Sequence, residues 1–321
     1  MPSRRPRSSL LPCLLAVACA LPAGAAAQEG PRVYEPGTFS TGAWDFFVAL
    51  TPDQRTAYIC RANGDFSYYT ILETSLANGR WTEPRAPAFS GRWSDADPHL
   101  SPDGSKLFFI SNRPLTGETP REEYDIWVVE RQAGGRWGAP RSLGVPVNRD
   151  GATEWSPSVA RNGNLYFGTI RDEGKGGNDL YLARWIGDRY AEPENLGDSV
   201  NTKAGEFEPW IAPDESYLIF SAQGRPEGPG GFDLYVSERR DGIWQRARPL
   251  APVNSPKGDF NHSVSPDGKY LFFSSTRGLF DSTPPAPLPY AEMQRRLTAI
   301  GNGLGDIYRI PVSELGIRVG D

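Results

Sequence analysis

Short apolar runs, each following a polar turn, repeat along the whole chain. The turn is clearest at Ser101-Pro102-Asp103-Gly104, it recurs in full at 265–268, and shorter copies occupy 51–53, 161–163 and 212–214. An apolar run such as Leu107-Phe108-Phe109 follows each turn. Pro presets φ, Asp hydrogen-bonds within its own turn and Gly accepts a positive φ, so each copy predicts a β-hairpin.

Two further elements complete each repeat. An alternating run opens with Asp at 125, 179, 233 and 306, and a Gly-x-Trp-x-x-Pro segment or a looser version of it begins at 79, 135, 187 and 242. The turns at 53, 103, 162, 214 and 267 lie 50 to 59 residues apart, so each repeat holds four short antiparallel strands. Four strands in about fifty residues are typical of a propeller blade, and the chain is predicted to be an all-β, five-bladed β-propeller.

The fifth repeat lacks its outer strand, and the missing piece is found near the N-terminus. Phe39 lies six residues before Asp45, just as Phe89 lies six residues before Asp95. We therefore expect the segment before Asp45 to supply the outer strand of the last blade. Such closure removes the free edges of an open array of strands.

Composition agrees with this architecture. Gly and Pro together make up 65 of the 321 residues, 35 and 30 respectively. That share is unfavourable for a helical bundle, because both residues are costly inside helices. With 12% aromatic residues the chain is also unlike a disordered low-complexity protein.

The first 27 residues predict a secretory signal, followed by one propeller domain over 28–321. Arg4, Arg5 and Arg7 precede an apolar stretch, and Ala25-Ala26-Ala27 offers a cleavage site. The expected location is periplasmic or secreted. The alternative is a lipoprotein anchored at Cys19, although Ala16 stands where such signals usually have Leu.

Removal of the signal changes the cysteine count and the charge. Cys60 alone remains of three cysteines, which excludes an internal disulfide and fits a small buried side chain. The signal holds three of the 34 basic residues, so 31 basic residues face 39 acidic ones, a net charge of −8. This argues against nucleic acid as a partner. No segment after the signal is long and apolar enough to predict a transmembrane helix.

The Ser-Pro-Asp-Gly turn, the Ser-x-Arg element at Ser111-Asn112-Arg113 and Ser275-Thr276-Arg277, and the Asp-Ile-Tyr strand start at Asp306 together resemble the TolB-like β-propellers. The resemblance covers residues 31–321. It implies a periplasmic or secreted module that binds or scaffolds, and it leaves the ligand open.

One set of charged residues recurs in every blade. An acid stands eight residues before each turn and an arginine follows the second strand, on what should be the same face of the disc. We call these ten residues the charged ring: Asp45, Asp95, Glu154, Glu206, Asp259, Arg61, Arg113, Arg171, Arg225 and Arg277. Either the ring binds a polar ligand, or its members form Arg–carboxylate bridges that pin the loops; recurrence in all blades favours bridges.

The inner strands also hold positions that vary between blades, six and four residues before each turn. Residues that maintain the architecture should be the same in every blade, whereas the residue types at these positions differ. These positions, together with neighbouring aromatic and histidine residues, are therefore the candidate ligand site. The candidate binding residues are Asp97, His99, Trp155, Glu208, Trp210, Asn261 and His262. His99 and His262 with Asp97 and Glu208 do not have the spacing of a metal motif, and a hydrogen-bonded channel lining is the preferred interpretation. The other residues seven before the turn, such as Phe46, Phe207 and Phe260, are expected to pack between blades.

The largest irregularity is an insertion at 278–305 in the last blade. It begins with a Pro-rich run and continues into a predicted amphipathic helix over 290–300, ended by Gly301 and Gly303. The helix could cover the channel, meet a partner or pack on the disc edge.

The predicted function is a non-catalytic binding or scaffolding module of the cell envelope. The expected partner is a protein or an envelope polysaccharide, with no cofactor, no resident metal and a monomeric state. The alternative is a carbohydrate-active hydrolase, which would use Asp97 and Glu208 as its pair of carboxyl groups.

Overall fold

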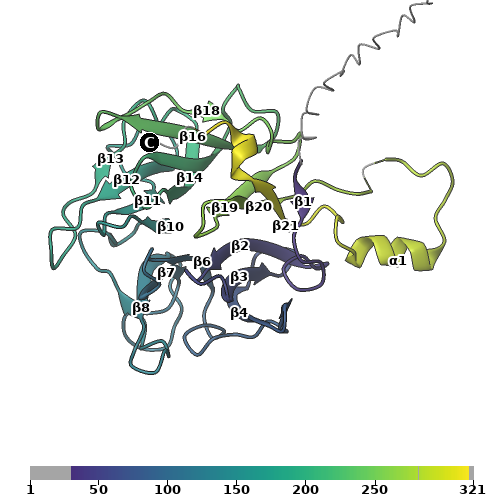
Figure 1. Cartoon of the computed structure of the whole chain (residues 1–321), viewed down its shortest axis with the longest axis horizontal. Helices are drawn as coiled ribbons and strands as arrows, with labels where there is room; N and C mark the ends of the chain where they lie inside the picture. The colour runs from purple at the N-terminus through teal and green to yellow at the C-terminus, as the bar shows by residue number, and fades with distance from the viewer. Residues whose placement is uncertain (1–29, 281, 318–321) are drawn as a thin grey trace, which may run out of the picture.

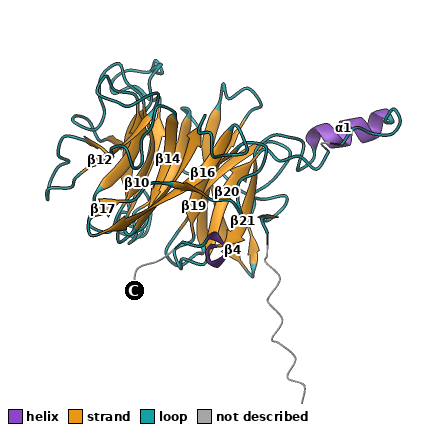
Figure 2. Cartoon of the chain, turned by 90° about the horizontal axis from the view of Figure 1, so that it is seen from above, coloured by secondary structure: helices purple, strands orange, loops and turns teal. Residues whose placement is uncertain are grey.

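The computed structural model describes residues 30–280 and 282–317. These residues form five antiparallel β-sheets around a central axis, which confirms the predicted five-bladed propeller (Figure 1). Seen edge-on, the blades lie side by side, and their strands run between the two ends of the disc (Figure 2). The predicted signal segment, 1–27, lies outside the described residues.

Each blade runs from an inner strand at the axis to an outer strand at the rim. Blade 1 has β2 (Trp44–Leu50), β3 (Thr56–Ala62), β4 (Tyr69–Ala77) and β5 (Arg80–Trp81), and blade 2 has β6 (Asp95–Leu100), β7 (Lys106–Ser111), β8 (Asp125–Glu130) and β9 (Arg141–Ser142). Blade 3 has β10 (Glu154–Val159), β11 (Leu165–Thr169), β12 (Asp179–Ala183) and β13 (Glu194–Asn195). In blade 4, β14 (Gly205–Ile211), β15 (Tyr217–Gln223) and β16 (Phe232–Arg240) are followed by β17 (Ile243–Trp244) and β18 (Arg248–Pro249), which both pair with β16.

Blade 5 is completed by the N-terminal segment, as predicted. Its inner strand is β19 (Asp259–Val264), followed outward by β20 (Tyr270–Ser275) and β21 (Asp306–Pro311). A 3₁₀ helix, η1 (Val312–Leu315), comes after β21 in the chain. The outer strand is β1 (Arg32–Val33), paired with β21 through Arg32↔Arg309 and Val33↔Tyr308. Phe39 behind it is fully buried. The first and last parts of the chain therefore share one sheet and close the ring.

The hairpin turns show the chemistry that their sequence predicted. Ser101 Oγ donates to Asp103 Oδ1 at 2.6 Å and accepts from the Lys106 backbone N–H at 3.0 Å. Gly104 has a φ of +71°, which a residue with a Cβ rarely adopts. We call the end of the disc that carries these turns the turn face, and the opposite end, with the loops between the second and third strands, the ring face.

Every inner strand contains a bulge at the same position, six residues before its turn. The pairing with the second strand shifts register there in all five blades. The bulged residues have φ between 45° and 56°, in the left-handed region that non-glycine residues seldom occupy. They are Phe47, Asp97, Ser156, Glu208 and Asn261. An extra residue in one strand re-aims the side chains on either side of it.

The insertion of blade 5 forms the predicted helix, α1 (Tyr290–Thr298), but the helix does not lie on the disc. None of its residues is buried, and it extends outward beyond β21 in both views (Figures 1 and 2). The channel therefore remains uncovered by α1. The base of the insertion is attached to the disc, since Asn302 Nδ2 donates to the Gly42 carbonyl at 3.1 Å.

Two smaller sequence features also appear. Cys60 is buried with a free thiol, and burial raises the pKa of that thiol well above its usual value. Within the described residues, no helix has both the length and the apolar character needed to cross a membrane.

Candidate functional site

In four of the five blades, the arginine and the acid of the charged ring form an ion pair within the blade. The acids of these pairs are fully buried. The pairs are Arg61 Nε–Asp45 Oδ1 at 2.6 Å, Arg113 Nη2–Asp95 Oδ1 at 2.6 Å, Arg225 Nη2–Glu206 Oε1 at 2.8 Å and Arg277 Nη2–Asp259 Oδ1 at 2.6 Å. Bidentate-capable guanidinium groups suit such buried carboxylates.

Each ring arginine also holds the loop that leads into its own inner strand. The arginines at 61, 113, 171, 225 and 277 donate to the backbone carbonyls of Thr38, Phe89, Val147, Val200 and Val253. In four blades the guanidinium group therefore joins the buried carboxylate to the carbonyl of the loop, which is the arrangement that the bridging interpretation describes.

Blade 3 departs from this arrangement. Arg171 donates to Val147 O at 3.1 Å, but no ion pair joins it to Glu154, and its Nε and Nη1 have no hydrogen-bond partner. Burial raises the pKa of Glu154 to about 8. All five ring arginines thus bond the carbonyl of their loop, but only four of them form the ion pair with the acid of their blade.

The bulges bring two carboxyl groups to the axis, where each joins neighbouring blades. Asp97 Oδ2 accepts from the backbone N–H of Ser156 at 3.1 Å and from its hydroxyl at 2.6 Å. Glu208 accepts from the backbone N–H and the side-chain amide of Asn261, both at 2.6 Å, and from the Ser221 hydroxyl at 2.8 Å. Asp97 therefore links blades 2 and 3, and Glu208 links blades 4 and 5.

Asp97, Ser156, Glu208 and Asn261 line a basin of about 730 Å³ on the ring face. Its wall is aromatic, and the rings contact one another in sequence around the axis. We call this set the aromatic collar: Phe207, Phe232, Phe260, Trp44, Phe66, Phe46, Tyr69, Tyr124 and Trp155. Neighbouring rings along it have centroids 4.7 to 6.4 Å apart, from Phe207–Phe232 to Tyr124–Trp155. Such rings offer broad apolar faces to a ligand.

The carboxyl groups of the basin have perturbed acidities. Burial raises the pKa of Asp97 to about 6, against the opposing effect of the Ser156 hydrogen bonds. Burial raises the pKa of Glu208 to about 7, and the nearby charge of Asp97 adds to the increase. A buried acid whose pKa is raised further by a charged neighbour in a cleft is typical of functional sites.

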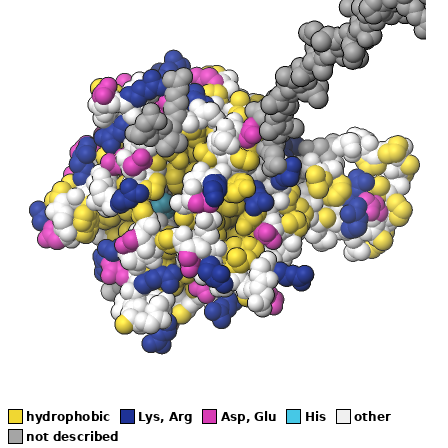
Figure 3. Space-filling view, in the orientation of Figure 1, with side chains coloured by type: hydrophobic (Ala, Val, Ile, Leu, Met, Phe, Trp, Pro, Cys, Tyr) yellow, Lys and Arg dark blue, Asp and Glu magenta, His cyan; other side chains and the backbone are white. Residues whose placement is uncertain are grey.

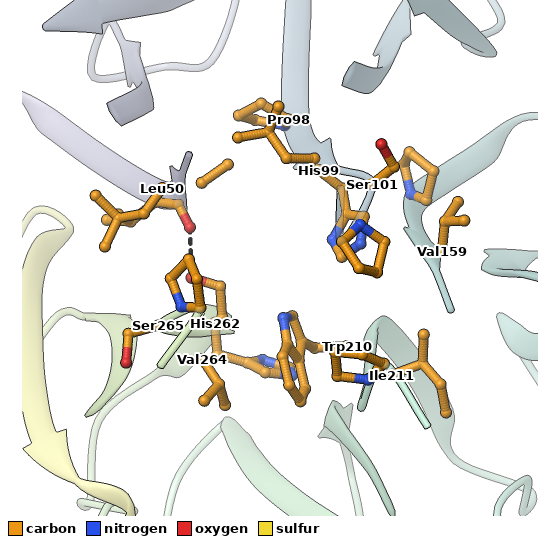
Figure 4. Close-up of a pocket in the computed structure, with 18 of the residues that line it drawn as sticks. Leu50, Pro98, His99, Ser101, Val159, Trp210, Ile211, His262, Val264 and Ser265 are labelled. Atoms are coloured by element: carbon orange, nitrogen blue, oxygen red, sulfur yellow. Dashed lines mark hydrogen bonds between the residues drawn. The ribbon is translucent and has the colours of Figure 1, made fainter. Parts of the chain in front are cut away.

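A second, smaller cavity of about 210 Å³ opens on the turn face. His99, Trp210 and His262 line it, and Figure 4 shows them approaching the axis from three different inner strands. A histidine is visible near the centre of the disc in Figure 3, which therefore looks onto this face. Burial lowers the pKa of each histidine to about 4, so both imidazoles are neutral at physiological pH.

The structure thus divides the seven candidate binding residues between two ends of the channel. Asp97, Trp155, Glu208 and Asn261 line the basin, whereas the two histidines and Trp210 line the turn-face cavity. Asp97 and His99, only two residues apart on β6, therefore line opposite ends of the channel. Within the described residues, no three His, Cys, Asp or Glu side chains lie close enough together to hold a metal ion.

Several collar residues were not identified from the sequence. Phe46, Phe207 and Phe260 were expected only to pack between blades, and they also form the basin wall. Tyr124 and Phe232 stand directly before the Asp that opens the third strand, where the other blades have Asn178 and Gly305. That variation between repeats was a signal for a site on the ring face.

Comparisons with known proteins give little beyond the fold. No family model matches the chain, and no curated protein matches it. Among solved structures, the chain is similar to an α-L-arabinofuranosidase from Lactobacillus brevis (13% identity, TM-score 0.46, covering 86% of this chain and 92% of that one). It is also similar to a gluconolactonase from Xanthomonas campestris (12% identity, TM-score 0.43, covering 91% of this chain and 98% of that one). A third similar structure is hydrazine synthase of Kuenenia stuttgartiensis (10% identity, TM-score 0.47, covering 84% of this chain and 40% of that one). Likenesses at this level of identity and TM-score carry no information about activity.

Proposed function

We propose that this protein is an exported, TolB-like propeller that acts as a non-catalytic binding module of the cell envelope, with its ligand in the ring-face basin. The observation that carries the proposal is the aromatic collar around a floor of hydrogen-bonding groups. Concave sites with apolar walls and a few convergent polar groups are the usual form of ligand pockets. The expected ligand is a small molecule or an exposed segment of a protein or envelope polysaccharide.

The hydrogen bonds of the two carboxyl groups favour binding over catalysis. Glu208 accepts three hydrogen bonds from groups of the protein, and one oxygen of Asp97 accepts two. A general acid must present a proton to its substrate, whereas both oxygens of Glu208 and one oxygen of Asp97 already accept hydrogen bonds from the protein. Their first role is to position the floor of the basin across blade boundaries.

A carbohydrate-active hydrolase is the second candidate. It is favoured by one specific observation, namely that Asp97 and Glu208 share the basin floor and that Asp97 raises the pKa of Glu208. Glycoside hydrolysis requires two such carboxyl groups, one of them with a raised pKa.

One experiment separates the two functions. The purified protein is titrated with 4-nitrophenyl glycosides and with 2-phenylethanol, and both tryptophan fluorescence and nitrophenolate release are recorded. We expect a saturable fluorescence change without nitrophenolate release. The change should be lost in Trp155→Ala, which removes part of the collar, and kept in Trp185→Ala, which alters a tryptophan outside the basin.

The other outcomes are equally informative. Release of nitrophenolate by the wild type, abolished in Glu208→Gln, would establish the hydrolase instead. A response equally lost in both tryptophan variants would show that the basin is not the binding site.

A further inference from the structure

The basin has a charge of one sign only. Its lining includes the carboxyl groups of Asp97 and Glu208 and no lysine, arginine or histidine side chain. The arginines of the charged ring are not part of this lining, and in four blades each is paired with its own buried carboxylate. No cationic side chain of the lining is therefore available to balance the two acids.

The wall adds to this negative character. The faces of aromatic rings carry the negative part of the ring quadrupole, and they attract cations within about 6 Å of the ring centre. In several places the protein already uses this attraction, as where Arg225 lies over Phe220 and Tyr235 at 5.0 and 4.7 Å. Within the basin the collar rings contact one another and line the empty volume, so their remaining surface faces an incoming ligand.

We propose that the basin binds an organic cation, an amine or quaternary ammonium group carried on an apolar body. This inference rests on the proposed binding function and specifies its ligand. The apolar body contacts the collar, and the cationic group reaches the floor between Asp97 and Glu208. A cation there satisfies the charge of both carboxylates, which a neutral sugar or an anion does not.

Proton release should accompany binding. The groups that face Asp97 are Glu208, Tyr69 and Cys60, and burial raises the pKa of the phenol and of the thiol, so both stay neutral. Burial raises the carboxyl pKa values to about 6 and about 7, so both acids titrate near neutrality. Since a bound cation favours the ionised carboxylates, the affinity for the cation should increase from pH 5 to pH 8.

The test uses three probes with one body and different charges. They are 2-phenylethylammonium, 2-phenylethanol and 3-phenylpropionate, titrated into the wild-type protein at pH 8 by calorimetry, with cellobiose as a carbohydrate probe. We expect the ammonium to bind at least about tenfold more tightly than the alcohol, and the carboxylate to bind least. The affinity for the ammonium should be weaker at pH 5 than at pH 8, while the affinity for the alcohol should not change.

Variants locate the effect. Asp97→Asn should weaken binding of the ammonium about tenfold and leave binding of the alcohol unchanged, which also shows that the basin is intact. Asp188→Asn removes the same charge from an exposed side chain and should change neither. Because the order of the three probes is measured in the wild type, the inference does not depend on the folding of a variant.

Each result decides between the two proposals. If cellobiose or 2-phenylethanol binds as tightly as the ammonium, or more tightly, the cation inference is wrong and the binding function stands. If none of the four probes binds, both are wrong.

Discussion

Replacing Arg113 by Met tests whether the charged ring is structural. The Arg113 side chain is 9% exposed and its partner Asp95 is 0% exposed, with 2.6 Å between Nη2 and Oδ1. The substitution leaves a buried carboxylate without its cation, which typically costs about 3–5 kcal/mol of unfolding free energy. It also leaves Phe89 O without its 2.9 Å donor.

Blade 3 supplies the matched control in the same chain. Arg171 occupies the equivalent position, stacks on Phe167 and Tyr181 as Arg113 stacks on Phe109 and Trp127, and makes no ion pair with its ring acid. Arg171→Met loses mainly one charged hydrogen bond to a carbonyl, at a cost of about 1.5–3 kcal/mol at most. It also removes Nε, which has no hydrogen-bond partner, and the 4.0 Å ion pair of Nη1 with the exposed Glu192, a kind of contact that contributes little to stability.

The assay is urea unfolding followed by tryptophan fluorescence for the wild type, Arg113→Met, Arg171→Met and the double variant Asp95→Asn/Arg113→Met. We expect Arg113→Met to lose more stability than Arg171→Met, and the double variant to recover part of that loss, since it no longer buries a lone carboxylate. Equal losses in the two arginine variants, or no recovery in the double variant, would refute a structural ion pair.

Two further predictions follow from closure of the ring and from the buried acids. Phe39→Ala should lower the unfolding free energy by about 3–5 kcal/mol, because this fully buried ring packs between Tyr34 and Trp81; a loss below about 1 kcal/mol in urea unfolding would contradict closure by the N-terminal segment. Burial raises the pKa of Glu154 to about 8 and that of Glu208 to about 7, so the folded state binds more protons than the unfolded state up to pH 8. The thermal midpoint should therefore be higher at pH 6.5 than at pH 8.5, with a smaller difference in Glu154→Gln. Below pH 6.5 the two histidines oppose this gain, since burial lowers the pKa of each to about 4; a midpoint that is unchanged or lower at pH 6.5 would show the acids to be unperturbed.

The architecture could be predicted because its determinants are local. Each hairpin turn is fixed by hydrogen bonds within five residues, such as Ser101 to Asp103 and to Lys106, so the same short sequence specifies the same turn wherever it recurs. Closure by the N-terminal strand was also predictable, because Phe39 and Phe89 stand at the same distance before their inner strands. Repetition supplied the long-range information that a single blade lacks.

The candidate site was predicted only in part, because the bulge interrupts strict alternation. Side chains of a regular strand alternate between two sides, so Asp97 and His99 were expected to share one site. The bulge lies between the paired residues Ala96 and His99, and Asp97 lines the basin while His99 lines the opposite cavity. Pro98 directly after the bulged residue was the available signal, because proline has no N–H for the ladder and is confined to edges and bulges.

The aromatic collar was not predicted from the sequence, for a different reason. Its rings come from five blades, and each one alone reads as an ordinary core residue. Only the closed ring places Trp155 of blade 3 against Tyr124 of blade 2 and Trp44 of blade 1 against Phe260 of blade 5. A site assembled across blade boundaries has no counterpart within any one repeat.

The bulged residues show why the floor of the basin has its particular composition. The strain is the same in all five inner strands, so the left-handed backbone is a property of the fold and marks no site by itself. The side chains there are joined as neighbours, Asp97 to Ser156 and Glu208 to Asn261. Five positions can form only two such pairs, and a fifth polar group at the buried axis would lack a partner.

Phe47 occupies that fifth position, and it is apolar and 8% exposed. Blade 1 therefore closes the axis with a ring instead of a hydrogen bond, and Phe47 lines the turn-face cavity and not the basin. Both acids of the floor then lie in blades 2 and 4, on either side of the bulged residue of blade 3. With Phe47 in the fifth position, the floor of the basin keeps two carboxyl groups and their two hydrogen-bonded partners, and its lining includes no lysine, arginine or histidine, so the proposed organic cation would supply the opposite charge.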